Sequence, residues 1–320
     1  MRRFLATAAA LTIGAVAPRS FAQVSGAEPT PAPTPEPAPA PYSLPWQLRP
    51  AIPVNVVRND LVLAFYQDPT SKKGGFIGVE SILVSVKLAP WVALAARGTV
   101  IGNAPPAPGA GAGSVANPVI AALFGWKHGD LRFAPSFSVA LPVGMGGGDK
   151  PDVGADAANK TAIRARSAMD NAVFATNYLT LIAGLDLAWI HGGFTVQAEA
   201  TLLGLMRVRG ASASPDPATV NLTLGLHAGY FFIPQLSLGA ELRHQRFVTT
   251  PKMVAADEAL QGDAALGLRD TTTFAVGPRL HFKLGASTWI RPGVAYARGV
   301  DRPLSKAAFN IVQLDVPVVF

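Results

Sequence analysis

The sequence predicts an all-β fold, an antiparallel up-and-down transmembrane β-barrel of about 12 strands, and three observations lead to this prediction. Apolar residues recur at every second position through most of the chain, which is the period of a strand rather than of a helix. The connections between these runs are alternately short and long. Hydrophobic residues make up 49% of the 320 residues and charged residues only 15%. A typical soluble domain carries about 25% charge, yet no run of about 18 apolar residues offers a membrane-spanning helix.

The first 22 residues are predicted to be a secretory signal peptide. Two arginines follow the first methionine, the stretch from Phe4 to Ala17 is apolar, and the sequence ending at Ala22 has the small-residue pattern of a cleavage site. The apolar stretch is too short for a transmembrane helix. Removing the peptide lowers the net charge from +7 to +4, because 24 basic residues then face 20 acidic ones. The basic residues form no cluster with interleaved aromatic residues, so no nucleic-acid partner is expected.

Residues 23–45 are predicted to be a Pro-rich periplasmic linker. Proline occupies every second position from Pro29 to Pro41. Such a segment favours the extended polyproline conformation and cannot pair in a sheet. A spacer is the expected role, and a tether to the cell wall or a binding segment for a proline-recognising partner is the alternative.

The alternating runs are expected within residues 46–320, the predicted barrel. They lie at 54–67, 75–88, 91–103, 118–127, 131–143, 178–190, 194–209, 219–231, 236–249, 271–283, 288–300 and 309–320. The first run extends back toward Trp46, and its two faces, like those of the fourth run, are ambiguous. Most runs have 10 to 16 residues, which is long for a soluble sheet and sufficient for a tilted strand that crosses a membrane.

The later runs show the alternation most clearly. Between Leu179 and Trp189 apolar residues alternate mainly with small or polar ones, and the same pattern follows Phe194. The clearest run begins at Val220 and leads through a tight turn at Pro234 into the next run. One face of each predicted strand is therefore apolar, and the other is small or polar.

The connections predict which side of the membrane each end of the barrel faces. Short connections lie at 89–90, 128–130, 191–193, 232–235 and 284–287, and longer ones at 68–74, 104–117, 144–177, 210–218, 250–270 and 301–308. Short periplasmic turns and long outer loops are typical of outer-membrane barrels. With 12 strands, both termini then lie on the periplasmic side.

Aromatic residues gather at the short-turn ends of the predicted strands. They include all five tryptophans and several other rings, namely Trp46, Trp91, Trp126, Trp189, Trp289, Tyr230, Phe231, Phe232, Phe282 and Phe320. Amphipathic rings favour the boundary between membrane and water. We therefore expect a periplasmic aromatic girdle.

Closure of the sheet follows from the absence of water in lipid. Every backbone N–H and C=O must be paired internally there, so an open sheet edge is excluded. A soluble β-sandwich or lipocalin-like barrel is the alternative, but its outward polar faces should carry many more charges than the glycine, serine, threonine and alanine found here.

The C-terminal run resembles the assembly signal of bacterial outer-membrane β-barrels, the porin-like and transporter-like class. The chain ends at Phe320, with Val318, Val316, Leu314 and Val312 at alternate positions before it. The resemblance covers residues 46–320 and implies insertion into the outer membrane by the barrel-assembly machinery. It implies no particular solute.

Strand parity predicts a set of lumen-lining residues. They are Lys87, Arg97, Arg132, Asp186, Glu199, Glu241, Arg243, Arg279, His281, Arg291 and Asp315, with Arg207 and Lys283 on the same faces. Basic residues outnumber acidic ones, which suggests a water-filled pore that favours anions. The alternative is a filled interior in which these residues pair across strands.

The longest loop, 144–177, is a candidate constriction. It begins with a glycine-rich hinge and continues with a helix-like, alanine-rich stretch from Ala155 to Ala172, with Asp156 as the expected N-cap. By analogy with the inward third loop of porins it would narrow the lumen. A mobile surface loop is the alternative.

Enzymatic functions are weakly supported. The five histidines are His128, His191, His227, His244 and His281. No G-x-S-x-G elbow is present, and only His244, with aspartates of the 250–270 loop, suggests an outer-membrane protease. A lipase or a protease is thus the least favoured function, no catalytic residue is assigned, and neither a cofactor nor a metal is expected.

The sequence leads to the hypothesis of a monomeric outer-membrane channel for passive passage of small solutes, with anions favoured. Outer-membrane lipid, the barrel-assembly machinery and a small solute are the expected partners. A structural or surface-interaction barrel with a filled interior is the alternative function.

Overall fold

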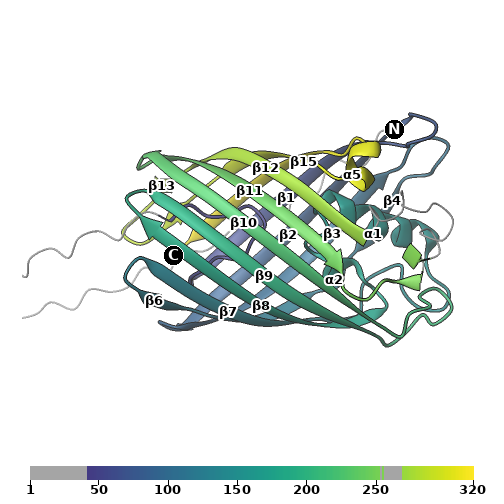
Figure 1. Cartoon of the computed structure of the whole chain (residues 1–320), viewed down its shortest axis with the longest axis horizontal. Helices are drawn as coiled ribbons and strands as arrows, with labels where there is room; N and C mark the ends of the chain where they lie inside the picture. Colours follow the sequence, from purple (N-terminus) through teal and green to yellow (C-terminus); the bar gives the residue numbers. More distant parts are fainter. Residues whose placement is uncertain (1–41, 253, 256–268) are drawn as a thin grey trace, which may run out of the picture. The chain divides into compact units, whose positions relative to one another are not determined.

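The computed structural model describes residues 42–252, 254–255 and 269–320, and these form a closed antiparallel β-barrel (Figure 1). The strands are β1 (Val56–Gln67), β2 (Gly74–Ala89), β3 (Val92–Ala104), β4 (Ala112–Val115), β5 (Val119–Phe124), β6 (Trp126–His128), β7 (Leu131–Ala140), β8 (Tyr178–His191), β9 (Phe194–Arg207), β10 (Ala218–Ile233), β11 (Leu236–Phe247), β12 (Asp270–Leu280), β13 (Phe282–Lys283), β14 (Trp289–Ile290), β15 (Gly293–Gly299) and β16 (Asn310–Val319). The signal peptide and nearly all of the linker lie outside the described residues.

These elements form 12 barrel strands, as the sequence predicts. The consecutive pairs β5–β6, β12–β13 and β14–β15 each form one interrupted strand, and β4 pairs with β3 outside the ring. The ring closes where β1 pairs with β16, from Val56 opposite Val319 to Phe65 opposite Asn310. No edge of the ring is therefore left unpaired, which is the condition for a sheet in lipid.

The apolar face of the sheet points outward. In β8, Thr180 and Asp186 are buried inside, whereas Leu185 and Leu187 are exposed on the outer surface. The other strands also expose apolar residues and bury many small or polar ones, although toward the long-loop end some inward positions are apolar, among them Val62, Ile77 and Val79. A soluble barrel would reverse these faces, so the pattern supports the transmembrane prediction.

Aromatic residues follow the outer surface near the short-turn end of the barrel, the end that holds the 129–130 and 192–193 turns. Trp91, Phe124 and Trp126 stack in a row with ring centroids 6.2 and 6.3 Å apart. Phe194 and Tyr230 continue the girdle farther round, with centroids 4.3 Å apart. This arrangement agrees with the predicted girdle.

Trp46 is the exception, and its assignment to the girdle is wrong. Its side chain is only 1% exposed and lies inside the barrel, against Gly293 and the guanidinium of Arg279. The chain before β1 turns into the lumen rather than along the lipid boundary. Tyr42, Ser43 and Leu44, expected in the periplasmic linker, are buried in the lumen as well.

In the described part of the chain three helices accompany the barrel: α1 (Val153–Ala165), α2 (Asn171–Phe174) and α5 (Arg302–Lys306). They lie toward the end opposite β6 and β13 (Figure 1), the long-loop end. None of the helices in the described part of the chain has the length and apolarity of a membrane span. The N-cap of α1 is Asp152, which accepts from the Ala155 amide at 2.9 Å, and not the expected Asp156.

Candidate functional site

Among the residues that the structure describes, two segments occupy the lumen, one from each end. The N-terminal insert (residues 42–55) enters at the short-turn end, and the loop insert (residues 144–177) enters from the long-loop end with α1 and α2. The two inserts differ in the contacts that hold them to the barrel wall, and these contacts determine how readily each insert can leave the lumen.

Polar contacts to the wall hold the N-terminal insert. The Trp46 amide donates to the Glu241 carboxylate, which is fully buried. The Tyr42 hydroxyl donates to Gln197 at 2.6 Å, and Arg49 pairs with Glu199 at 3.0 Å. These partners come from β9 and β11, so the insert is anchored to the wall across the lumen from its own entry into β1.

Glycines in the wall leave space for the side chains of this insert. A Cβ at Gly225 would lie 2.7 Å from Leu48, and one at Gly293 would lie 2.5 Å from the Trp46 ring. Both distances are too short for packed atoms. The small inward-facing residues at these positions therefore create the space in the wall that the side chains of the insert occupy.

Apolar packing holds the loop insert. The alanines along one face of α1, including Ala158 and Ala162, are fully buried against a cluster that contains Val62, Ile77 and Val79. Small side chains let the helix approach the wall closely, and the buried apolar area stabilises the contact. The loop therefore folds inward, as the constriction hypothesis proposes, and not outward as a surface loop.

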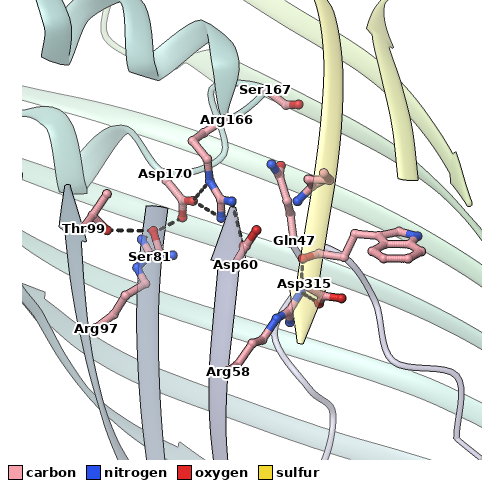
Figure 2. A network of polar contacts seen from close by, with 12 residues as sticks. Gln47, Arg58, Asp60, Ser81, Arg97, Thr99, Arg166, Ser167, Asp170 and Asp315 are labelled. Carbon is pink, nitrogen blue, oxygen red and sulfur yellow. Dashed lines mark hydrogen bonds and ion pairs between the residues drawn. The ribbon is translucent and has the colours of Figure 1, made fainter. Parts of the chain in front are cut away.

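Ion pairs join the tip of the loop insert to the wall (Figure 2). Asp170 accepts from Arg97 of β3 and from Arg166, each at 2.9 Å. Arg166 also pairs with Asp60 of β1 at 2.7 Å. The buried Ser81 and Thr99 hydroxyls bond to each other at 2.8 Å beside this chain of charges.

A second network lies at the β1–β16 seam and reaches the N-terminal insert. Arg279 donates to both oxygens of Asp315, at 2.6 and 3.0 Å. Arg58 of β1 pairs with the same carboxylate at 2.6 Å (Figure 2) and donates to the Trp46 carbonyl. The seam and the insert therefore share one arginine.

Arg243 links the two inserts. It is fully buried and pairs with Glu241 at 2.6 Å, while Glu241 holds the Trp46 amide. Its Nη1 donates to Ser167 of the loop insert at 3.4 Å, and its Nη2 also donates to Gln313 of β16 at 3.0 Å. The contacts that hold the two inserts are therefore joined through this arginine.

A cavity of about 100 Å³ remains between the inserts. Gln47 and Arg49 line it from one side, and Met169 and Asp170 from the other. Arg97, Glu199, Thr201, two serines and apolar residues of the wall complete the lining. A volume of this order holds several waters or a small organic molecule.

The structure places the predicted lumen-lining residues at different depths. Asp186, Glu199, Glu241, Arg243, Arg279, His281 and Asp315 are buried inside, and Arg97 and Arg291 are partly buried. Lys87, Arg132, Arg207 and Lys283 lie at the ends of their strands. Parity did not reveal Arg49, Arg58 and Asp60. The first run was ambiguous because Asn59 and Glu80 place a hydrogen-bonded polar pair on the outer surface, where apolar residues were expected.

The histidines lie apart from one another. His191 pairs with Asp130 at 2.8 Å in an exposed turn, and His281 bonds to Ser237 at 2.8 Å. His227 lies between the Ser43 hydroxyl, at 3.3 Å, and Glu241, at 3.5 Å. Glu241 is paired with Arg243 and accepts from the Trp46 amide. We therefore interpret the series Ser43, His227 and Glu241 as contacts that anchor the insert, and not as a catalytic triad.

Neither a protein-family model nor a curated protein sequence matches the chain. Solved structures do match. The COG4313 outer membrane channel from Pseudomonas putida F1 has a TM-score of 0.52 and 11% identity, over 86% of this chain and 98% of that one. The NanC porin gives 0.47 and 8% over 82% and 98%, and the KdgM porin gives 0.45 and 10% over 82% and 99%. The chain has the fold of a bacterial outer-membrane β-barrel. Together with the apolar exterior, this fold places it in the outer membrane.

Proposed function

We propose that the protein is a channel for passive passage of small solutes, and that the arrangement described above is its closed state. The observation that carries this proposal is the way in which the lumen is closed. Two inserts that are not barrel strands fill it, and one of them is held mainly by polar contacts. Behind the N-terminal insert the wall is lined mainly by small and polar residues, which suit a hydrated passage. Behind the loop insert the wall also carries apolar residues, among them Val62, Ile77 and Val79.

The charge of the wall modifies the expected preference for anions. Arg279 and Arg58 share Asp315, and Arg97 shares Asp170 with Arg166. This pairing reduces the free positive charge on which anion selectivity would depend. We therefore propose small polar solutes as the cargo, with anions among them.

Conductance in planar lipid bilayers tests the proposal. The full chain should show rare or small single-channel steps, and deletion of residues 42–50 should make the steps frequent and larger. A deletion of equal length within the Pro-rich stretch, residues 29–37, is the control and should leave conductance unchanged. Absence of steps in a chain that lacks both residues 42–50 and residues 150–172 would refute the channel.

A structural or surface-interaction barrel is the second candidate, because a filled lumen suits it equally. In that case deletion of residues 150–172 would abolish binding of a partner without producing any conductance. We propose no catalytic role. Lipase and protease assays of the folded protein, with His244→Ala as control, should detect no activity that depends on this histidine.

We also propose that the barrel is a monomer that contacts outer-membrane lipid and is inserted by the barrel-assembly machinery. The closed ring of 12 strands supports a self-sufficient unit, because every strand has two neighbours in the same chain. The mass of the folded protein in detergent tests this point.

A further inference from the structure

Two carboxylates face each other on the lumen wall. Asp186 of β8 lies directly opposite Glu199 of β9, and the two residues are only 1% and 7% exposed. Like charges in this position on adjacent strands destabilise a sheet. Burial increases the cost unless a cation lies close by.

Arg49 supplies that cation from the N-terminal insert inside the lumen, not from a barrel strand. Its Nη2 pairs with Glu199 Oε1 at 3.0 Å and also donates to the Thr201 hydroxyl. Its backbone amide donates to the other Glu199 oxygen at 2.7 Å. The wall therefore carries a cation site that a separate segment fills.

The wall is shaped for a planar cation beside the carboxylates. In the next row Gly184 lies opposite both Ser136 and Thr201. A Cβ at position 184 would lie 2.8 Å from Arg49 Nη2 and 2.5 Å from Ser136 Oγ, so only glycine leaves room for the guanidinium. Ser136 is 9% exposed, and its hydroxyl has no hydrogen-bond partner among the described residues. A free buried hydroxyl thus adjoins the same space.

Arg49 fits this space incompletely. Its Nε lies 4.0 Å from Asp186 Oδ2 and donates to no described residue. Gln197 donates to Asp186 at 2.8 Å instead. The occupant is therefore held less firmly than the site allows.

We propose that this cradle binds a solute with a guanidinium group and that Arg49 is an internal competitor for it. The cradle consists of Ser136, Gly184, Asp186, Glu199 and Thr201. A guanidinium donates several hydrogen bonds in one plane and matches carboxylates better than an ammonium, which acts as a point charge. The cavity between the inserts is lined by Arg49 and by two cradle residues, Glu199 and Thr201, so a solute in it would reach the site. The inference rests on the proposed channel function, since the solute would displace the insert on its way.

Binding of agmatine, a guanidinium with no carboxylate, tests the proposal. Calorimetry uses the full chain folded in detergent. Arg49→Ala should bind agmatine about tenfold or more tightly than the wild-type protein, which must first release its own guanidinium. Adding Glu199→Gln to Arg49→Ala should weaken binding about tenfold or more, because a charged hydrogen bond is lost. Butylurea, which is planar but uncharged, should not bind.

Arg246→Ala is the matched control. It removes the same charge and frees another carboxylate, Asp270, which Arg246 contacts at 3.2 Å in a partly exposed pair. Its agmatine binding should equal that of the wild type. No gain in Arg49→Ala, an equal gain in Arg246→Ala, or no loss with Glu199→Gln would each overturn the proposal.

A second measurement applies if Arg49→Ala does not fold. The chain has no cysteine, so Ser43→Cys gives a single thiol in the N-terminal insert. Agmatine should speed its maleimide labelling and butylurea should not; equal rates with and without agmatine would overturn the proposal. Agmatine binding without conductance in any variant would keep this site and refute the channel. Conductance without agmatine binding would keep the channel function and refute the guanidinium site.

Discussion

Replacing Gly225 with leucine should expel the N-terminal insert from the lumen. A Cβ at this position would lie 2.7, 2.8 and 2.9 Å from three carbons of Leu48, which is 1% exposed. Losing the burial of one leucine costs about 2 kcal/mol, and forcing extra atoms into a packed site costs about 1–2 kcal/mol. The closed arrangement should therefore weaken by about 3–4 kcal/mol, which is roughly 100- to 1000-fold in its population relative to the open one.

Labelling of Ser43→Cys with a maleimide measures this change, because Ser43 is a buried residue of the insert itself and labelling requires the insert to leave the lumen. Gly225→Leu should raise the labelling rate by the factor above, and it should make conductance steps frequent in bilayers. Gly204→Leu is the control, because a Cβ there has its nearest neighbour at 4.0 Å. An unchanged labelling rate in a folded Gly225→Leu barrel would refute the steric argument.

Three further substitutions test the networks and the assembly signal. Asp315→Asn leaves the buried Arg279 without its carboxylate and should destabilise the barrel by about 3–5 kcal/mol, seen as a lower urea midpoint of unfolding. Asp170→Asn removes one of the two carboxylates of Arg166; limited proteolysis of the loop insert should accelerate, while the strands keep their circular dichroism. Phe320→Ala should reduce the fraction of chains that assemble, measured by heat-modifiable gel mobility, and full assembly of this variant would contradict the resemblance.

The barrel strands could be predicted because lipid imposes the pattern residue by residue. Outward positions that face lipid are mainly apolar, so the alternation that begins at Val220 shows by itself that the segment is a strand, which face points outward and roughly how long it is. The closing pair also follows from this pattern, since an even number of antiparallel strands brings β1 beside β16. No contact between distant residues is needed for these inferences.

The N-terminal insert could not be predicted because it has no period. Tyr42, Trp46 and Arg49 are held by residues about 150 to 195 positions later in the chain, and no local pattern reports such partners. Trp46 suits a membrane boundary by chemistry alone, and only the empty space over Gly293 shows why it lies inside. The cradle could be predicted only in part, because parity turned Asp186 and Glu199 inward, but the cation beside them, Arg49, comes from the N-terminal insert.

The arginine shared between the seam and the insert bears on how the barrel is made. Arg58 lies on the first strand, pairs with Asp315 on the last, and bonds to the Trp46 carbonyl immediately upstream. The zipping of these two strands and the seating of the insert therefore depend on the same side chain. We expect them to occur as one step, so that a newly made barrel is already shut when it enters the membrane and the cell's permeability barrier is never breached during biogenesis.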